Sequence, residues 1–411
     1  MKVKKIKNLY IFGGGTVNHV ANHFSVCAPA YGNTAKSLKK LCDDRFASMN
    51  VILKLTKMAD SSSKIETNGD LNEEIENLIK DMSTKIIFFT AAVCDFEPVD
   101  PKGKNDYRFS SRNGNIGLEF RPSEKIVSKI RKHRKDITLV AFKTTCGATK
   151  QEMYEAGLGL CKDSSVNLVL VNDVQTRYNM IITPEEAAYH ETYDRDKVLW
   201  HLVDICYHRS HLTFTRSTVI EGDLVSWKDE RIPDSIRKIV DFAIQSSAYK
   251  PFKGSTVGHF AIKLSDTEFL TSVRKSNFND LDKNGMVYVK TDGPDTVLAY
   301  GAKPSVGGQS QRIIFKDHEG MDCVVHFHCP LKENHPDDIR IVSQREVECG
   351  SHECGRNTSD NLKEFGNLKC VMLDNHGPNI VFNRNIDPQE VISFIDRNFD
   401  LDKKTGGYNL I

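Results

Sequence analysis

The chain has 411 residues, too many for one ordinary hydrophobic core, which suggests about two to three domains at roughly 150 residues each. Its composition, 39% apolar and 27% charged, excludes a disordered or fibrous chain. Lys and Arg number 56 and Asp and Glu 55, so the formal net charge of +1 provides no overall field for nucleic acid or an anionic membrane.

Targeting signals and cysteines indicate where such a chain works. No apolar run approaches the roughly 18–20 residues of a membrane span. The basic N-terminus reaches its glycines too early for a signal peptide. Eleven cysteines at irregular spacing favour reduced thiols. We therefore expect a cytoplasmic protein without a nucleic-acid or membrane partner.

The first half alternates apolar strands with amphipathic helices. Such alternation is typical of a parallel sheet covered on both faces. The predicted fold class is therefore α/β, with a Rossmann-like doubly wound parallel sheet. Strands are predicted at 8–13, 50–56, 85–92, 137–142 and 166–171, and helices at 34–49, 71–82, 122–134, 149–163 and 196–207.

The pattern becomes polar and mixed near residues 208–233. We therefore predict a first domain at 1–212, a linker at 213–233 and a second domain at 234–411. Short strands separated by Gly, Asn and Asp turns predict an α/β second domain with a mainly antiparallel sheet. Its strands are predicted at 258–264, 268–273, 285–291, 296–301, 311–315 and 323–328, and its helices at 234–249, 357–365 and 388–399.

A glycine loop, Gly13-Gly14-Gly15-Thr16, follows the first strand directly. Glycines let backbone N–H groups approach phosphate oxygens without interference from a Cβ. The loop is neither a dinucleotide fingerprint, because position 18 is Asn, nor a Walker A loop, because no Gly-Lys-Ser/Thr follows. A nucleotide-binding loop and a plain tight turn both stay open.

Further stretches follow in order: VANHFS at 20–25, TAAVCDFEP at 90–98, LVAFKTT at 139–145 and LVLVND at 168–173. With the glycine loop, this succession resembles the phosphopantothenoylcysteine synthetase family, the nucleotide-dependent ligases of coenzyme A biosynthesis, over residues 8–207. The resemblance implies a homodimer-prone Rossmann-like fold. It also implies that CTP or ATP, with Mg²⁺, activates a carboxylate as an acyl-nucleotidylate and that an amine then displaces the nucleotide.

The resemblance implies particular site residues. Asn22 matches the family asparagine that stabilises the acyl-nucleotidylate, and an uncharged donor suits a developing oxyanion. Structural roles stay open, as a helix cap for Asn22, a turn former for Asp95 and a strand-end residue for Asn172. The implied nucleotide contacts are phosphates at Gly14, Gly15 and Thr16, a strand end at Ala92 and Asp95, and base and ribose at Phe142, Lys143 and Asn172.

Two departures from this family concern the substrate. The usual Ser-Ser-Gly after the asparagine is replaced by His23-Phe24-Ser25-Val26. The lysine-rich lid is replaced by residues 107–112, YRFSSR. Arg108 or Arg112 is expected to clamp a triphosphate there, because guanidinium binds phosphate at least as well as ammonium does.

Histidines at metal spacing mark the second half. His326 and His328 are two residues apart in a predicted strand, so both imidazoles should lie on one face. His376 follows another strand in an Asn-His-Gly turn. Three imidazoles with an open position are the ligand set of a catalytic zinc ion. A rival thiol set, with Cys323, Cys329, Cys349 and Cys354, stays open as a structural zinc site.

The two histidine motifs, with GHF at 258–260, KPS at 303–305 and ECGS at 348–351, resemble the class II aldolase/adducin family over about 235–411. The resemblance implies a zinc-dependent aldolase, epimerase or decarboxylase acting on a small anionic hydroxy-carbonyl compound. Zinc would polarise the carbonyl as a Lewis acid. Many members are tetramers, so a homodimer or homotetramer is expected.

The aldolase-like half lacks one expected group. The family's acid/base carboxylate falls at Gly307, and Glu348, Glu353 or His318 is the candidate replacement. Arg274, Lys275 and Ser305 are candidates for binding an anionic substrate.

We therefore predict a bifunctional enzyme, with a ligase acting on small carboxylate and amine substrates and a zinc-dependent lyase. The alternative is a scaffold or binding protein built from two catalytically decayed enzyme folds.

Overall fold

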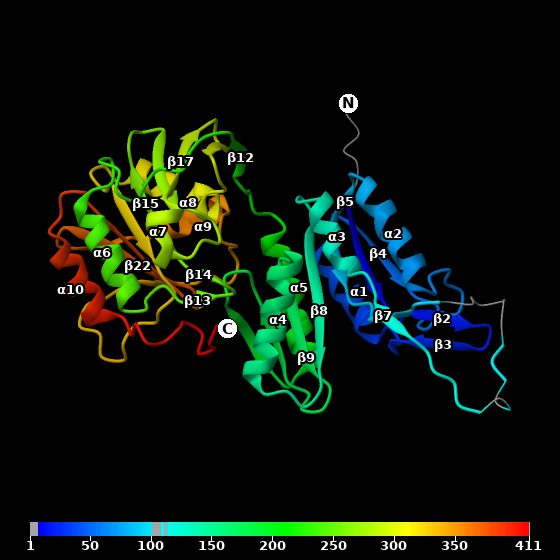
Figure 1. Ribbon diagram of the computed structural model, residues 1–411. Helices are drawn as coiled ribbons and strands as arrows, with labels where there is room; N and C mark the ends of the chain where they lie inside the picture. Colours follow the sequence, from blue (N-terminus) through cyan, green and yellow to red (C-terminus); the bar gives the residue numbers. More distant parts are fainter. Residues whose placement is uncertain (1–6, 101–107, 111, 113, 411) are drawn as a thin grey trace. The chain divides into compact units, whose positions relative to one another are not determined.

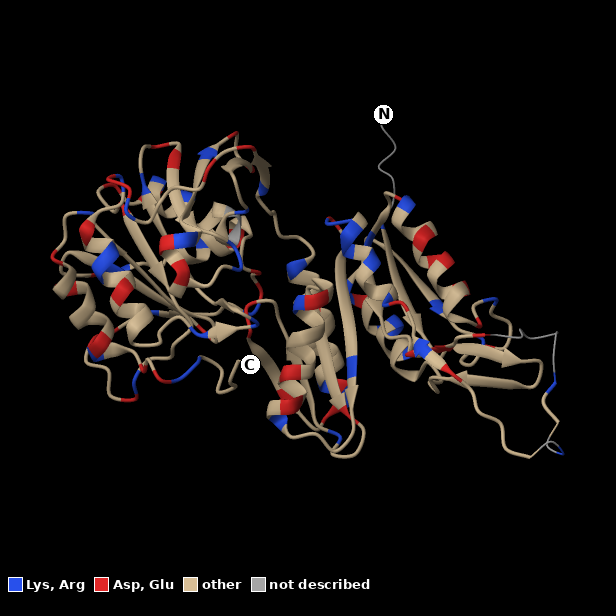
Figure 2. Cartoon of the chain, in the orientation of Figure 1, with Lys and Arg blue, Asp and Glu red and all other residues tan. Residues whose placement is uncertain are grey.

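The computed structural model describes residues 7–100, 108–110, 112 and 114–410 (Figure 1). The chain divides into two compact units of similar size. The first comprises residues 1–184 and 189–210, and the second comprises residues 185–188 and 211–411. Basic and acidic residues are intermixed along the chain in both units (Figure 2). No helix in the described ranges is long and apolar enough to cross a membrane.

The first unit is built on a seven-stranded sheet in the order β11-β10-β9-β8-β5-β1-β4. Neighbours from β4 to β9 are parallel, and β10 is antiparallel to β9. The predicted doubly wound parallel sheet is therefore confirmed. The strands are β1 (Asn8–Gly13), β4 (Asn50–Leu55), β5 (Thr84–Phe89), β8 (Thr138–Thr145), β9 (Leu168–Asp173), β10 (Asn179–Ile182) and β11 (Ala188–Thr192).

Helices cover both faces of this sheet, because the right-handed crossover from β1 to β4 runs in one direction along the sheet and those from β4 to β5, β8 and β9 run in the other. One face carries α1 and α5, which pack together, and the other carries α2, α3 and α4. The helices are α1 (Asn33–Arg45), α2 (Asn68–Lys80), α3 (Ile126–His133), α4 (Lys150–Ser164) and α5 (Arg195–Arg209). Two small ribbons lie beside the sheet, β2 (Val17–Ala21) with β3 (Phe24–Cys27) and β6 (Phe96–Pro98) with β7 (Phe120–Pro122).

The second unit is built on a mainly antiparallel sheet, as predicted, in the order β12-β18-β17-β16-β15-β19-β23-β22-β20, with β21 beside β22. Its strands are β12 (Arg216–Ile220), β15 (His259–Lys263), β16 (Glu268–Ser272), β17 (Met286–Thr291), β18 (Thr296–Tyr300), β19 (Cys323–His326), β20 (Ile341–Val342), β21 (Lys363–Phe365), β22 (Leu368–Leu373) and β23 (Gly377–Phe382). A separate ribbon pairs β13 (Pro251–Phe252) with β14 (Ser255–Thr256).

Strand alternation assigns the two faces of this sheet. Phe260 and Val325 belong to the core shared with α6 and α10, whereas Ala261 and Val324 belong to the core shared with α8. His326 therefore faces the α8 side. The helices are α6 (Asp234–Gln245), α7 (Leu281–Asn284), α8 (Gln309–Asp317), α9 (His352–Ser359) and α10 (Pro388–Asn398), with 3-10 turns η2 (Phe278–Asp280) and η3 (Ser305–Gly308).

Two secondary-structure predictions in this unit are wrong. Residues 311–315 were predicted as a strand but lie in α8, because a short apolar run does not distinguish a buried strand from one face of a helix. The predicted helix at 357–365 spans the end of α9 and then β21. α9 can approach α8 closely because residue 355 is glycine, where a Cβ would lie 2.5 Å from Ile313.

The segment predicted as a linker, 213–233, is folded into the second unit. Residues 216–220 form β12, which is parallel to β18 in the second sheet. Trp227 is buried in the core of the second unit. The segment after residue 210 is therefore part of that unit, although its polar composition does not reveal this.

Arg134 anchors the amino-terminal edge of the first sheet. Its guanidinium donates to the carbonyls of Ile79, Asp81 and Thr84 at 2.9–3.0 Å and to both carboxylate oxygens of Asp136. These bonds hold the pKa of Asp136 well below its usual range. A depressed carboxyl pKa stabilises the fold above about pH 4, and the contribution is lost as the pH falls.

Replacing Arg134 with Met should lower the free energy of unfolding of the first unit by about 2–4 kcal/mol, because several buried acceptors lose their donor. Urea unfolding of the full chain measures this. Arg121→Met is the matched control, because its ion pair with Glu97 is solvent-exposed and should be worth less than about 1 kcal/mol. Equal losses in the two variants would contradict the anchoring role.

Candidate functional site

The predicted nucleotide residues gather at the carboxyl edge of the first sheet. β9, β8, β5 and β1 are consecutive parallel strands, so the residues at their ends share one edge. Gly14 and Ala92 follow the ends of β1 and β5, Asn172 is next to the last residue of β9, and Phe142 lies within β8, three residues before its end. In open α/β sheets ligands bind at this edge, where the strand order reverses, which here is between β1 and β5. Lys143 lies beside Phe142 and is exposed.

The glycine loop itself differs from the prediction. The backbone amides of Gly15 and Thr16 donate to the carbonyls of Ala30 and Ala92, at 2.8 and 3.0 Å. A Cβ at Gly15 would lie 1.9 Å from the carbonyl oxygen of Ala28. These amides are therefore used to fix the loop rather than directed at a phosphate.

The Thr16 hydroxyl is buried and connects the glycine loop to the segments that carry Asn68 and Cys94. It donates to Asn68 Oδ1 at 2.6 Å and accepts from the amide of Cys94 at 2.9 Å. Asn68 also donates to the Cys94 carbonyl. Sequence reasoning missed Asn68, because no motif surrounds it.

Asn22 lies at the exposed turn of the β2–β3 ribbon. Phe109 from the predicted lid contacts the rings of the neighbouring His23 and Phe24, at centroid distances of 6.4 and 6.3 Å. Arg108 is exposed in the same segment.

The remaining predicted residues of the first unit, Asp95 and Arg112, are exposed. Asp95 is exposed and forms an ion pair with Lys125 at 2.6 Å, in the loop before β6. Arg112 is exposed, while positions 107 and 111 of the predicted lid lie outside the described residues.

Arg195 is a cation at this edge that sequence reasoning missed. It donates to Asn179 and to Thr34, which lies in the first turn of α1, and its guanidinium lies 6.0 Å from the ring centre of Phe142. Burial lowers the pKa of Arg195 to about 10, so it remains charged at neutral pH. α1 starts after Gly32 without a side-chain cap, and such a helix start attracts anions.

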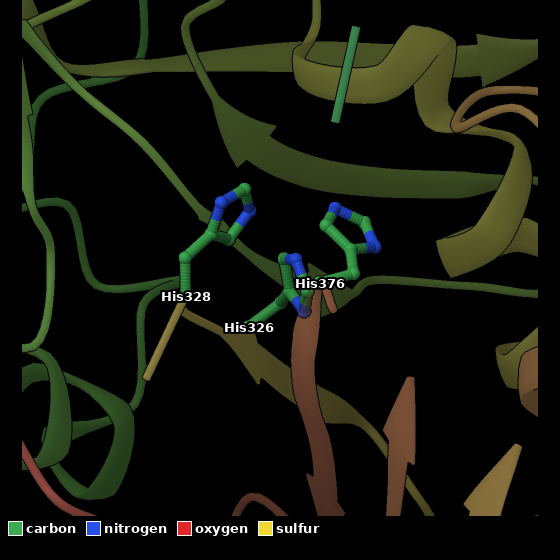
Figure 3. Close-up of side chains that lie close together, drawn as sticks. All are labelled: His326, His328 and His376. Carbon is green, nitrogen blue, oxygen red and sulfur yellow. The ribbon is translucent and has the colours of Figure 1, made fainter. Parts of the chain in front are cut away.

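The three predicted metal ligands are brought together in the second unit (Figure 3). His326 ends β19, His328 follows it, and His376 lies between β22 and β23. One ligand nitrogen from each lies within 4.8 Å of the others, and all three side chains are buried. The ring centroids are separated by 4.6–5.0 Å. The sequence placed His326 and His328 within one strand, whereas β19 ends at His326 and His328 reaches the cluster from the segment that follows.

Backbone geometry at the Asn-His-Gly turn positions His376. Asn375 adopts a left-handed conformation with φ of 56°, which Asn tolerates better than most residues. Gly377 has φ of 146°, and a Cβ there would lie 2.0 Å from the carbonyl oxygen of Phe327. Only glycine therefore lets this turn approach the segment that carries His328.

His326 is prepared to act as a ligand. Its Nδ1 lies 2.7 Å from the Pro378 carbonyl, so Nδ1 carries the proton. Its Nε2 is buried and forms no hydrogen bond within the described part of the chain. Burial and the neighbouring His259 and His328 lower the pKa of His326 well below its ordinary value, which keeps the imidazole neutral. A neutral ring with an unpartnered nitrogen fits a metal ion.

Residues outside the predicted set surround the cluster. Glu186, from the segment between β10 and β11, places Oε2 3.0 Å from His328 Nδ1, and both side chains are buried. Thr405 donates its amide to the His328 carbonyl and its hydroxyl to the His376 carbonyl, both at 3.0 Å. Sequence spacing gives no signal for these contacts, because they join segments far apart in the chain.

The two glutamates predicted as replacements for the missing carboxylate are located differently. Glu353 lies in the first turn of α9, and its carboxylate accepts the amide of Thr213 at 3.0 Å. Glu348 is buried just before α9, but neither glutamate belongs to the group of close-lying side chains that could hold a metal ion. Among the residues that the structure describes, no such group includes a cysteine, so the rival thiol site is not assembled.

The predicted anion-binding residues meet near the same sheet edge. Arg274 donates its amide to the Lys303 carbonyl, and Val273 bridges to Pro304, which brings the loop after β16 beside Ser305. The end of β16 lies at the same edge as the end of β19, two strands away, or roughly 10 Å. Arg274 and Lys275 are exposed and Ser305 is buried.

Comparison with known proteins agrees with this division. Residues 13–199 match the DNA/pantothenate metabolism flavoprotein C-terminal domain, and residues 243–387 match the class II aldolase and adducin N-terminal domain. Each family model thus matches a separate part of the chain, and both resemblances drawn from the sequence are confirmed.

The coenzyme A biosynthesis bifunctional protein CoaBC of Thermococcus kodakarensis is 22% identical over 172 residues, which cover 41% of this chain and 42% of that protein. The match thus spans less than half the length of this curated relative. A DNA/pantothenate metabolism flavoprotein from Streptococcus pneumoniae is 19% identical, covering 48% of this chain and 97% of that chain, with a TM-score of 0.40. L-fuculose 1-phosphate aldolase is 14% identical, covering 40% and 79%, with a TM-score of 0.29.

Gly377→Ala should destabilise the second unit by about 3 kcal/mol or more, because the new methyl group overlaps a backbone carbonyl. Thermal unfolding of the full chain measures the effect. Gly320→Ala is the control, since Gly320 also has a positive φ but open space around it, and should cost about 1–2 kcal/mol. Similar costs at the two positions would show that the close approach at Gly377 is unimportant.

Proposed function

We propose that the chain is a bifunctional enzyme. Its first half would be a CTP- or ATP-dependent carboxylate–amine ligase, and its second half a zinc-dependent lyase acting on a small anionic hydroxy-carbonyl compound. The observation that carries the proposal is the presence of two separate sets of groups, a cation at a strand-end edge and three gathered imidazoles, in domains of these two enzyme families.

The ligase proposal is supported by the carboxyl edge of the first sheet. Arg195 and the uncapped start of α1 together suit a triphosphate, because both present positive charge to an anion. The carboxylate substrate would attack the nucleotide, forming an acyl-nucleotidylate with release of pyrophosphate. An amine would then displace the nucleoside monophosphate. Asn22, as a neutral amide donor, would stabilise the acyl-nucleotidylate.

Pyrophosphate release from CTP and ATP, measured with a panel of small carboxylates, tests the ligase half. Asn22→Ala should lower the rate by about 10²–10³-fold, the usual effect of removing one donor to a developing charge. Asn33→Ala, in the first turn of α1, is a comparison that probes the phosphate end rather than the acyl end. Indifference of the wild-type chain to every acid and nucleotide would remove the ligase proposal.

The lyase proposal is supported by the fit of the histidine cluster to a metal ion. His326, His328 and His376 would hold the ion, and the buried, unpartnered Nε2 of His326 is the observation that favours it. When bound, zinc would supply Lewis-acid polarisation of a substrate carbonyl. Arg274, Lys275 and Ser305 would bind the anionic end of the substrate, since they lie at the same edge of the sheet.

Zinc content tests this half directly. The wild-type chain should retain about one zinc per chain after dialysis, and His326→Ala should lose it, because two imidazoles hold a divalent ion much more weakly than three. Metal analysis of the purified proteins measures this. His335→Ala is the control, because His335 is outside the cluster and its ring contacts the Asp337 carbonyl. Zinc retention by His326→Ala would refute the site.

We also propose self-association of the chain. The first unit exposes large apolar side chains on the two small ribbons and the segment joining β6 to β7, and exposed apolar patches are typical of interaction sites. These side chains are Phe24, Phe96, Val99, Ile116 and Leu118.

The alternative function is a scaffold or binding protein. Absence of both zinc binding and nucleotide binding would favour this alternative over the bifunctional enzyme.

A further inference from the structure

We propose that Glu186 is the positioning carboxylate of the metal centre, pairing with Nδ1 of His328 so that Nε2 of this ring faces the ion. This inference rests on the proposed metal centre and adds a residue that the aldolase-family match, 243–387, does not contain. Glu186 lies within the other family match, 13–199.

The two neighbouring histidines have corresponding surroundings. His326 Nδ1 lies 2.7 Å from a carbonyl oxygen, that of Pro378, and its Nε2 is left for the ion. His328 Nδ1 lies 3.0 Å from Glu186 Oε2. An acceptor on the far nitrogen of a metal-binding histidine fixes its tautomer and its orientation. Both rings therefore have an acceptor at Nδ1, which leaves the same atom, Nε2, for the metal.

Glu186 is not itself one of the ligands. Donor atoms on one zinc ion lie about 2.0–2.2 Å from it, so any two of them are less than about 4.4 Å apart. The group in which every donor lies within 4.8 Å of the others contains the three histidines and not Glu186. Its carboxylate oxygen is out of line with the Nδ1–H direction, since His328 Nδ1 makes no aligned hydrogen bond among the described residues. A rotation of the ring as Nε2 binds an ion would align the pair.

The position of Glu186 is held by the C-terminal segment. The buried ammonium of Lys404 donates to the Glu186 carbonyl at 2.7 Å and to the Thr405 carbonyl at 2.8 Å. Thr405 in turn bonds the carbonyls of His328 and His376. One short segment thus ties the carboxylate loop to two of the three metal-binding residues.

The neighbouring Glu185 holds the other side of the loop. Its carboxylate accepts the amide of Cys349 at 2.7 Å. Glu186 itself has a φ of 58°, which is unfavourable for a residue with a side chain. A strained residue held from both sides is fixed by its surroundings, as a positioning group requires.

The charge of Glu186 has a further consequence. A carboxylate paired with a ligand imidazole makes that imidazole a stronger donor and partly offsets the charge of a divalent ion. Position 307, where the family's acid/base carboxylate is expected, is glycine. The negative charge beside this centre therefore comes from the segment between β10 and β11, so the metal affinity of the second unit depends on that segment.

Glu186→Gln tests the pairing, because it removes the charge and keeps the side-chain volume. Zinc affinity of the full chain, measured by competition with a chromophoric chelator, should fall about 10–100-fold. Glu364→Gln is the control and should bind zinc as the wild-type chain does, since Glu364 pairs with Lys369 at the end of β22 opposite to His376.

A second readout separates positioning from a structural effect. In the zinc-loaded chain, the Nδ1 proton of His328 should give a far-downfield proton resonance, and Glu186→Gln should shift it upfield. Wild-type affinity in Glu186→Gln, or weaker affinity with this resonance unchanged, would overturn the assignment. Failure of the wild-type chain to bind zinc would instead refute the metal centre itself, so the two failures are distinguishable.

Discussion

The histidine cluster depends on one close approach between two backbone segments. The backbone of Gly377 passes so near the Phe327 carbonyl that no Cβ fits between them. This approach sets His376 against the end of β19, where alternation directs His326 to the face of the sheet covered by α8 and His328 follows in the next segment. Burial then keeps His326 neutral. The geometry of the proposed metal centre thus follows from main-chain packing at a single glycine.

In the first unit, the sequence predicted that the glycine loop binds phosphate. Hydrogen bonds to neighbouring loops hold this loop in place instead. Thr16, Asn68 and Cys94 share one buried network, and the amides of Gly15 and Thr16 donate to other loops. The glycines therefore serve close packing at the carboxyl edge of the sheet. Arg195, the first residue of α5, adds a positive charge at the carboxyl edge of the sheet.

The second unit draws on segments that are remote from each other in the chain. Residues 185–188 and the segment around Lys404 both meet the histidine cluster, and both lie outside the aldolase-family match. These contacts with the histidine cluster can form only when the chain contains all of these segments.

The sequence alone determined the two fold classes and identified the three histidines and several strand-end residues as candidate site residues, because periodicity and motif spacing are local properties. It misassigned residues 311–315, since a short apolar run fits a helix face or a strand equally well. Only the tertiary structure revealed Arg195, Glu186 and Thr405. Their contacts are made by side chains and backbone groups far apart in sequence, and such contacts follow from packing, which leaves no pattern along the chain.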